Sequence, residues 1–247
     1  MPHRGIRVLS LNVAHGRGLA FHQTLASTRR VQQNLDAIAR VVAATGVDVV
    51  ALQELDAPSS WSGEFDHLAY LADRTGLAHL FHGLHMNLRT PRLAYGTGVL
   101  SRWPLAGGTT RRFGQNALDT KGYVRVRVAG PGAEVDLVSL HLDFKRDKER
   151  RAQLALLSQD LHWNPPRGPL VVAGDFNTTP ERTLIPEFMQ AHTLRASGSP
   201  LHPTFPSVRP RRRIDEVLVS EHFEVRHHEV VDVQVSDHLP VLAELRA

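Results

Sequence analysis

A short apolar run ends in a polar motif at residues 170–177, Leu170-Val171-Val172-Ala173-Gly174-Asp175-Phe176-Asn177. The four apolar residues are typical of a strand buried on both faces. An Asp/Asn turn after that strand accounts for Gly174-Asp175, but it leaves the added Asn177 unexplained. The motif therefore predicts a buried strand whose end places a carboxylate and an amide at one point.

The rest of the chain predicts an α/β (α+β) protein. Apolar runs and apolar–polar alternation predict further strands, at residues 6–13, 47–52, 98–101, 123–128, 135–142, 214–219, 230–235 and 241–245. Helical spacing of apolar residues predicts helices at residues 28–44, 65–74, 147–163 and 180–191. Residues 77–95 follow neither pattern, so we expect a long loop there. Many strands with few helices indicate two packed sheets with helices outside.

Composition narrows the class of protein. With 247 residues and no linker-like segment, residues 1–247 are expected to form one domain. The absence of cysteine excludes disulfides, thiolate metal sites and cysteine nucleophiles. No apolar run approaches the roughly 20 residues of a membrane span, and the N-terminus lacks a signal-peptide core. We therefore expect a cytoplasmic protein with no membrane span and no obligate protein partner. The net charge of +4 mildly favours anionic partners.

Polar residues recur beside the ends of the predicted strands. They are rich in Asp, Glu, Asn and His, and they comprise Asn12, Gln53-Glu54, His141-Leu142-Asp143, Gly174-Asp175-Phe176-Asn177, Ile214-Asp215 and Ser236-Asp237-His238. Rigid strand ends can deliver such side chains to a common rim. Carboxylate and amide oxygens suit Mg²⁺, with Mn²⁺ also possible. Together with histidines they suit phosphate ester hydrolysis, in which charge on the phosphoryl oxygens is neutralised and a water is aimed in line.

The order of these motifs resembles the endonuclease/exonuclease/phosphatase superfamily, which has the deoxyribonuclease-I-like fold. The resemblance extends from Leu11-Asn12-Val13 to Ser236-Asp237-His238-Leu239-Pro240-Val241 and is most specific at residues 174–177 and 236–240. Within the superfamily, the chain is most similar to short, uncharacterised bacterial hydrolases that consist of the catalytic domain alone. The resemblance implies a four-layer sandwich, in which two packed, mostly antiparallel sheets are flanked by helices.

The resemblance also implies roles for individual residues. Glu54 corresponds to the principal metal ligand, with Asn12 and Asp237 completing or supporting the metal site. Asp175 corresponds to the carboxylate that orients or deprotonates the attacking water, and Asn177 to an amide that positions the phosphate and Asp175. His238 corresponds to a histidine that contacts the phosphate, and Asp215 to its carboxylate partner. His141 corresponds to the second histidine of the family.

The implied activity is Mg²⁺-dependent hydrolysis of phosphodiesters by in-line water attack. The substrate stays open between nucleic acid and a lipid or small-molecule phosphodiester. One motif, His141-Leu142, is more similar to the deoxyribonuclease, sphingomyelinase and inositol-phosphatase branches than to the abasic-site endonucleases. The alternatives are a phosphomonoesterase of the inositol-phosphate type and a non-catalytic binding protein that retains the fold.

Three further groups carry histidine or arginine side chains near or outside these motifs. His15 follows Asn12 closely, so we expect it to contact the substrate. Arg211 and Arg212 belong to a basic run before Asp215 and are expected to guide an anionic substrate. His79, His82 and His85 recur every three residues, but with no predicted element to aim them we expect no metal site there.

Overall fold

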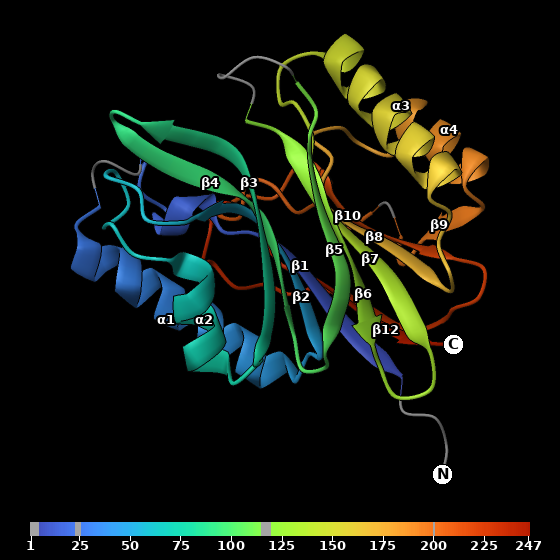
Figure 1. The fold of residues 1–247 in the computed structure, drawn as a ribbon, viewed down its shortest axis with the longest axis horizontal. Helices are drawn as coiled ribbons and strands as arrows, with labels where there is room; N and C mark the ends of the chain where they lie inside the picture. The colour runs from blue at the N-terminus through green and yellow to red at the C-terminus, as the bar shows by residue number, and fades with distance from the viewer. Residues whose placement is uncertain (1–4, 23–25, 115–119, 200) are drawn as a thin grey trace.

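The computed structural model describes residues 5–22, 26–114, 120–199 and 201–247. Within these ranges the chain forms two six-stranded sheets (Figure 1). The first sheet has the order β11-β12-β1-β2-β4-β3 and contains β1 (Ile6–Asn12), β2 (Val49–Asp56), β3 (His79–Arg89), β4 (Arg92–Ser101), β11 (Glu224–Val230) and β12 (Val241–Arg246). The second has the order β5-β6-β7-β8-β10-β9 and contains β5 (Leu105–Arg112), β6 (Gly122–Ala129), β7 (Glu134–His141), β8 (Leu170–Asp175), β9 (Leu194–Ala196) and β10 (Asp215–Ser220).

Helices cover the outer faces of both sheets. Figure 1 shows α1 (Thr28–Thr45) and α2 (His67–Thr75) outside the first sheet, and α3 (Asp147–Trp163) and α4 (Leu184–Ala191) outside the second. Three apolar clusters separate the layers, one between the two sheets and one between each sheet and its helices. Strand alternation explains this division, because Val8 faces the other sheet while its neighbour Leu9 faces the helices. The predicted four-layer sandwich is confirmed.

Each sheet is antiparallel except for one parallel pair. In the first sheet β1 runs parallel to β2, and in the second β7 runs parallel to β8. The remaining pairs named in these sheets are antiparallel, as expected. Parallel strands end at the same edge of their sheet, so the polar residues at the ends of β1 and β2 lie together, as do those at the ends of β7 and β8.

The helix ends follow the signals in the sequence. Ser27 caps α1 by accepting a hydrogen bond from the Arg30 backbone N–H, and Gly46 ends that helix in the left-handed conformation. The fourth helix begins at Leu184 rather than at residue 180, which places Pro186 in its first turn. Proline is tolerated there because N–H groups in the first turn have no partner within the helix.

Two predicted elements differ from the structure. The expected loop at residues 77–95 is instead the hairpin of β3 and β4, and the strand expected at 230–235 lies earlier, at Glu224–Val230. The sequence also gave no sign of β5 or β9. All four strands β3, β5, β9 and β11 lie at sheet edges, where one side faces solvent and polar residues replace the apolar pattern.

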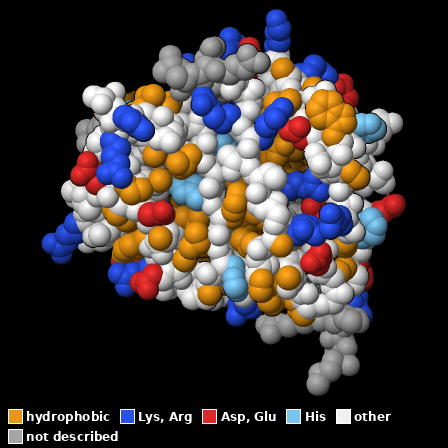
Figure 2. Space-filling view, viewed as in Figure 1, with side chains coloured by type: hydrophobic (Ala, Val, Ile, Leu, Met, Phe, Trp, Pro, Cys, Tyr) orange, Lys and Arg blue, Asp and Glu red, His pale blue; other side chains and the backbone are white. Residues whose placement is uncertain are grey.

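The surface carries charges of both signs. On the face shown in Figure 2, Lys and Arg side chains are interspersed with Asp and Glu rather than gathered into one continuous basic area. None of the helices in the described ranges has the length and apolarity that crossing a bilayer demands.

Candidate active site

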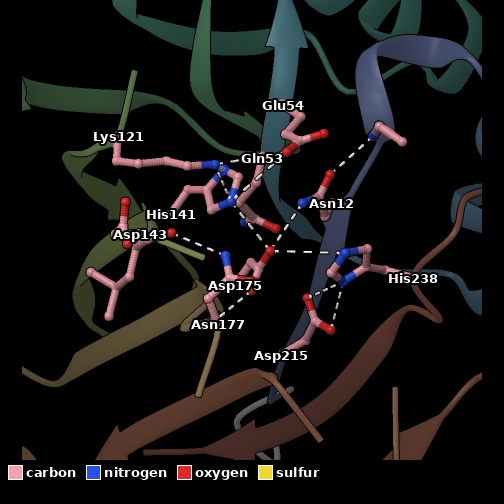
Figure 3. A network of polar contacts seen from close by, with 12 residues as sticks. Asn12, Gln53, Glu54, Lys121, His141, Asp143, Asp175, Asn177, Asp215 and His238 are labelled. Carbon is pink, nitrogen blue, oxygen red and sulfur yellow. Dashed lines mark hydrogen bonds and ion pairs between the residues drawn. The ribbon is translucent and has the colours of Figure 1, made fainter. Parts of the chain in front are cut away.

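Residues from both sheets meet at the end of the sandwich where the parallel strands stop (Figure 3). Asn12, His141 and Asp175 are the last residues of β1, β7 and β8, and Asp215 is the first residue of β10. Asp215 and Asp175 are also register partners across β10 and β8. The six polar motifs of the sequence therefore converge, as their positions beside strand ends predicted.

Asp175 is the hub of this cluster. Its Oδ2 atom accepts a hydrogen bond from Asn12 Nδ2 at 3.1 Å and lies 3.3 Å from His141 Nε2 and 3.9 Å from His238 Nε2. Its Oδ1 accepts the Asn177 backbone N–H at 2.9 Å. Burial alone would raise the pKa of Asp175, but attraction to His141 and His238 outweighs it and lowers that pKa. Asp175 is therefore an ionised carboxylate in a buried position.

The residues beside Asp175 explain why it is held there. Gly174 has φ +150°, and a Cβ atom would lie 2.0 Å from the Leu140 carbonyl oxygen, so only glycine fits between β8 and β7. Phe176 is fully buried under the second sheet. Asn177 adopts a left-handed backbone with φ 51°, and its side-chain amide donates to the Leu142 carbonyl at 3.0 Å. The added asparagine of the motif thus fixes the turn after the strand.

His238 is held by a carboxylate on the opposite side from Asp175. Its Nδ1 lies 2.9 Å and 3.1 Å from the two carboxylate oxygens of Asp215. The Asp215 carboxylate also accepts a hydrogen bond from Thr204 Oγ1. Burial would lower the pKa of His238, but Asp215 and Asp175 raise it to about 10. The ring is therefore an imidazolium, with Nε2 directed toward Asp175.

His141 differs from His238 because a lysine stands beside it. Lys121 Nζ lies 2.6 Å from His141 Nε2 and 3.8 Å from Glu54 Oε1. Burial and the Lys121 charge lower the pKa of His141, so this ring is neutral at pH 7. The site thus contains one charged and one neutral imidazole on either side of Asp175.

Glu54 faces the cluster from the first sheet. It lies where the register of β2 and β4 shifts, and its backbone is left-handed with φ 50°. Such a bulge turns a side chain away from the regular pleat. Burial opposes the ionisation of Glu54, but His15, Lys121 and His141 outweigh burial and lower its pKa to about 2. Glu54 is therefore an ionised, partly exposed carboxylate, and its oxygens are of the kind that Mg²⁺ and Mn²⁺ bind, so the residues present fit such an ion.

Another group in the described part of the chain satisfies a metal-site distance criterion. One ligand atom from each of Asp175, Asp215 and His238 lies within 4.8 Å of the others. His238 Nδ1 is hydrogen-bonded to Asp215, however, and its Nε2 is directed toward Asp175. Both ring nitrogens therefore face carboxylates of the same group, so neither of them is directed at an open position for a metal ion.

The other two expected metal ligands have protein partners. Asn12 Oδ1 accepts the Ala14 backbone N–H at 3.0 Å, which leaves its second lone pair for a further contact. Asp237 forms an ion pair with Arg17 and lines the same cavity as Glu54. Both side chains belong to the site, and each is held by a closer protein contact than the 3.6 Å between Glu54 Oε2 and His15 Nε2.

A cavity of about 420 Å³ opens onto the cluster. Beyond the residues above, its walls include the expected substrate contacts His15 and Arg212, together with Arg17, Tyr95, Phe144 and Phe205. Arg211 is exposed and is not among the lining residues. Arg213, from the same basic run, is buried in an ion pair with Glu216 and does not face the cavity. The basic run therefore divides into a residue at the cavity, a residue at the surface and a residue in the interior.

His79, His82 and His85 lie in β3, so a strand does aim them. His82 contacts the Leu55 carbonyl and His85 contacts Thr97 Oγ1. Burial is the main reason why the pKa of His85 is lowered to about 3, and the nearby His141 lowers it further. Among the described residues the three do not form a group with metal-ligand spacing, and each of His82 and His85 has a protein partner instead.

Sequence reasoning missed several residues at the site. Lys121 and Arg17 bring cations to it, and Asp56 lies behind His15. Asp56 was detectable, because it is a second carboxylate two positions after Glu54 at the end of the same strand. Lys121 was not, because it precedes β6 with no pattern around it.

A polar bridge joins the two sheets beneath the cluster. Gln53 Nε2 donates to Ser139 Oγ at 3.2 Å, and Ser139 Oγ donates to the Leu52 carbonyl at 3.1 Å. Both Gln53 and Ser139 are fully buried. The bridge links β2, which carries Glu54, to β7, which carries His141.

Comparisons with known proteins agree with this arrangement. The model of the endonuclease/exonuclease/phosphatase family matches residues 9–238. The uncharacterised Escherichia coli K12 protein YbhP is 29% identical over 227 residues, which are 86% of this chain and 84% of YbhP. An endonuclease/exonuclease/phosphatase from Beutenbergia cavernae has a TM-score of 0.78 at 24% identity, over 98% of this chain and 72% of that one.

A mannosyl-6-phosphatase from Bacteroides thetaiotaomicron has a TM-score of 0.72 at 16% identity, over 98% of this chain and all of that one. These two structural likenesses show a shared fold. The family match extends from β1 to His238 and so includes every strand end that builds the cluster. The chain belongs to the endonuclease/exonuclease/phosphatase family.

Proposed function

We propose that residues 1–247 form one catalytic domain that hydrolyses phosphodiesters with the help of Mg²⁺ or Mn²⁺. The observation that carries the proposal is the position of Asp175. Its ionised carboxylate has an imidazolium, His238, on one side and a neutral imidazole, His141, on the other. In-line hydrolysis needs a group that accepts a hydrogen bond from the attacking water and a fixed cation that stabilises the phosphoryl oxygens. Asp175 and His238 supply these two groups side by side.

Asp175 acts mainly by orienting the attacking water. Its lowered pKa makes it a weak base at pH 7, and the ideal pKa of a general base lies near the working pH. A loose phosphoryl-transfer transition state demands little proton abstraction before bond formation, so orientation matters more than basicity. Asn12 and Asn177 hold the carboxylate through its two oxygens, and the free face of the Asn177 amide is available to position the phosphate.

The two histidines act on the phosphate. His238 keeps its proton through Asp215 and offers Nε2–H to a phosphoryl oxygen, whose negative charge it stabilises. His141 is neutral and receives a contact from Lys121, so it serves as a hydrogen-bonding partner of the phosphate.

Glu54 would hold the metal, with Asn12 and Asp237 supporting it. When bound, the ion supplies charge neutralisation at the phosphoryl and leaving oxygens. Arg212 at the cavity, Arg211 on the exposed loop beside it and His15 in the cavity wall would attract or contact the anionic substrate.

Turnover of bis-p-nitrophenyl phosphate with Mg²⁺ or Mn²⁺, and its loss in EDTA, tests this function. We expect Asp175→Ala and His238→Ala each to lower kcat by about 10²–10⁴-fold, with an unchanged far-UV circular dichroism spectrum as the check on folding. Wild-type turnover that persists in EDTA, or full activity in either variant, would contradict the proposal. If p-nitrophenyl phosphate or mannose 6-phosphate is cleaved and the diester is not, the enzyme is a phosphomonoesterase. Binding without turnover would indicate a non-catalytic protein.

Parallel assays separate the candidate substrates. Plasmid DNA, sphingomyelin vesicles and a soluble phosphodiester of a small alcohol present the same diester group with different surroundings. The substrate class is the one whose kcat/KM exceeds that of bis-p-nitrophenyl phosphate and falls by the same factor in Asp175→Ala.

A further inference from the structure

A second carboxylate-backed histidine, His15, lines the same cavity as His238. His15 Nδ1 is 2.7 Å from Asp56 Oδ1, and the other carboxylate oxygen of Asp56 accepts a hydrogen bond from Trp61 Nε1 at 2.9 Å. Asp56 is fully buried. Nothing in the phosphoryl chemistry above requires this pair, because the His238 pair already supplies the cation that faces Asp175.

The surroundings of His15 fix its ring in one orientation. Trp61 and Tyr95 make edge contacts with it, with ring centroids 5.2 Å and 4.9 Å away. The turn that carries it is fastened by Asn12 Oδ1, which accepts the Ala14 N–H, and by Asn34, which donates to the Gly16 carbonyl. A ring held in this way is built to present its remaining nitrogen, Nε2, in a fixed direction.

That direction is toward Glu54. His15 Nε2 lies 3.6 Å from Glu54 Oε2, which is beyond good hydrogen-bond length. Both residues have left-handed backbones, with φ 54° for His15 and 50° for Glu54. Non-glycine residues in this region are energetically costly, and such residues gather at functional sites. Two facing residues with this backbone indicate that their mutual placement serves a function.

The two oxygens of Glu54 have different neighbours. Oε1 lies 3.8 Å from Lys121 Nζ and 3.9 Å from His141 Nε2, so cationic charge already stands on that side. Oε2 faces His15. A metal ion held by Glu54 therefore fits the Oε2 side, away from the lysine.

We propose that His15 is a nitrogen ligand of the metal ion held by Glu54, and that Asp56 is the positioning residue that directs its lone pair. The inference rests on the proposed function for the presence of the ion. Two atoms bound at about 2.1 Å to one octahedral ion lie about 3 Å apart when adjacent and about 4.2 Å apart when opposite, and the observed 3.6 Å falls between these limits. Metal-binding histidines donate their other ring N–H to a carboxylate, as the Nδ1 contact to Asp56 allows.

The other histidines of the cavity are less suited to this role. His141 Nε2 has Lys121 Nζ at 2.6 Å, and His238 Nε2 is directed toward Asp175. An imidazole ligand beside a carboxylate favours a transition-metal ion over Mg²⁺, which prefers oxygen. The inference therefore selects Mn²⁺ as the better activator.

The test measures Mn²⁺ binding without substrate. Isothermal titration calorimetry gives the affinity, and electron spin-echo envelope modulation of bound Mn²⁺ detects a directly coordinated ¹⁴N nucleus. His15→Asn is the main variant, because asparagine tolerates the left-handed backbone but is too short to reach. Glu54→Gln is the reference for loss of the site, and His222→Ala, an exposed position, is the matched control.

We expect a ¹⁴N signal in the wild type and in His222→Ala, and no such signal in His15→Asn. Asp56→Asn should lower the Mn²⁺ affinity by about 10–100-fold, with a smaller effect on Mg²⁺. An unchanged affinity and ¹⁴N signal in His15→Asn, together with a raised KM, would overturn the inference and leave His15 as a substrate contact. The proposed function fails separately, if the wild type binds Mn²⁺ no better than Glu54→Gln.

Discussion

Asp175 and Asp215 are register partners on adjacent antiparallel strands, and the ring of His238 connects their carboxylates through its two nitrogens. Two buried carboxylates so close would repel each other if both were ionised without a cation nearby. The imidazolium resolves this conflict, so the same contact both stabilises the fold and holds charge for the reaction.

The Asp215–His238 pair makes stability depend on pH. The pKa of His238 is raised to about 10 in the folded chain and is about 6.5 in an unfolded chain. Its contribution is therefore fully present below pH 6.5 and is lost as pH rises toward 10. Asp215→Asn should lower the free energy of unfolding by about 2–3 kcal/mol at pH 6.5 and flatten its decline between pH 6.5 and 10. Urea unfolding across that range measures both effects; equal slopes in the two proteins would contradict the assignment.

Gly174 controls the approach of β8 to β7. A Cβ atom there would meet the Leu140 carbonyl oxygen at 2.0 Å, whereas a Cβ at Gly76, also left-handed, would meet nothing within 4 Å. Gly76→Ala should cost about 1–2 kcal/mol, the price of the left-handed backbone alone. Gly174→Ala should cost clearly more and also lower kcat by displacing Asp175. Thermal unfolding and diester turnover of the two variants provide the comparison, and equal losses of stability would show that the close approach is unimportant.

Arg211 and Arg212 are neighbours in sequence with different access to the cavity. Arg212→Ala should raise KM for an anionic diester about threefold to fivefold at low salt, corresponding to an exposed charge contact of up to about 1 kcal/mol. The effect should shrink as salt increases, because the Debye length falls to about 8 Å at 0.15 M. Arg211→Ala should change KM less, and the double variant should show the weakest salt dependence. Identical kinetics for all variants at low salt would remove both arginines from substrate attraction.

Arg213, just before β10, forms an ion pair with Glu216 of that strand, and each side chain is almost fully buried. Glu216→Leu alone leaves the guanidinium unpaired and should cost about 3–5 kcal/mol, while Arg213→Met combined with Glu216→Leu should recover most of that loss. Chemical denaturation of the single and double variants measures the coupling. If the double variant is as unstable as the single one, the attraction within the ion pair exceeds the free-energy cost of removing both charges from water.

The buried elements could be predicted from sequence, and the exposed edges could not. Strands such as β1 and β8 lie inside a sheet and bury both faces, so their apolar runs identify them. The four edge strands, β3, β5, β9 and β11, were missed or misplaced, together with the start of the neighbouring β4. One side of each edge strand faces solvent. Polar residues therefore replace part of the apolar–polar alternation by which a strand is recognised in a sequence. The histidines of β3 made that hairpin look like a loop for this reason.

The site divides in a similar way. Its centre, Asp175 with Asn177, was predictable from the sequence. An Asp/Asn turn accounts for Asp175 but not for Asn177, so the motif indicated more than a turn. The partners Lys121 and Trp61 come from segments distant in sequence, and only the packing of two sheets brings them to the cavity. The arrangement of His15 on a left-handed turn also depends on contacts from α1 and β2 that no local pattern encodes.

The Gln53–Ser139 bridge joins the sheets directly below the cavity. Glu54 belongs to one sheet and Asp175 to the other, so the span between them changes whenever the two layers slide. Catalytic rate should therefore serve as a sensitive gauge of interlayer alignment. Substitutions of valines far from the cavity that shift one sheet by a fraction of an ångström should slow turnover before they measurably loosen the protein.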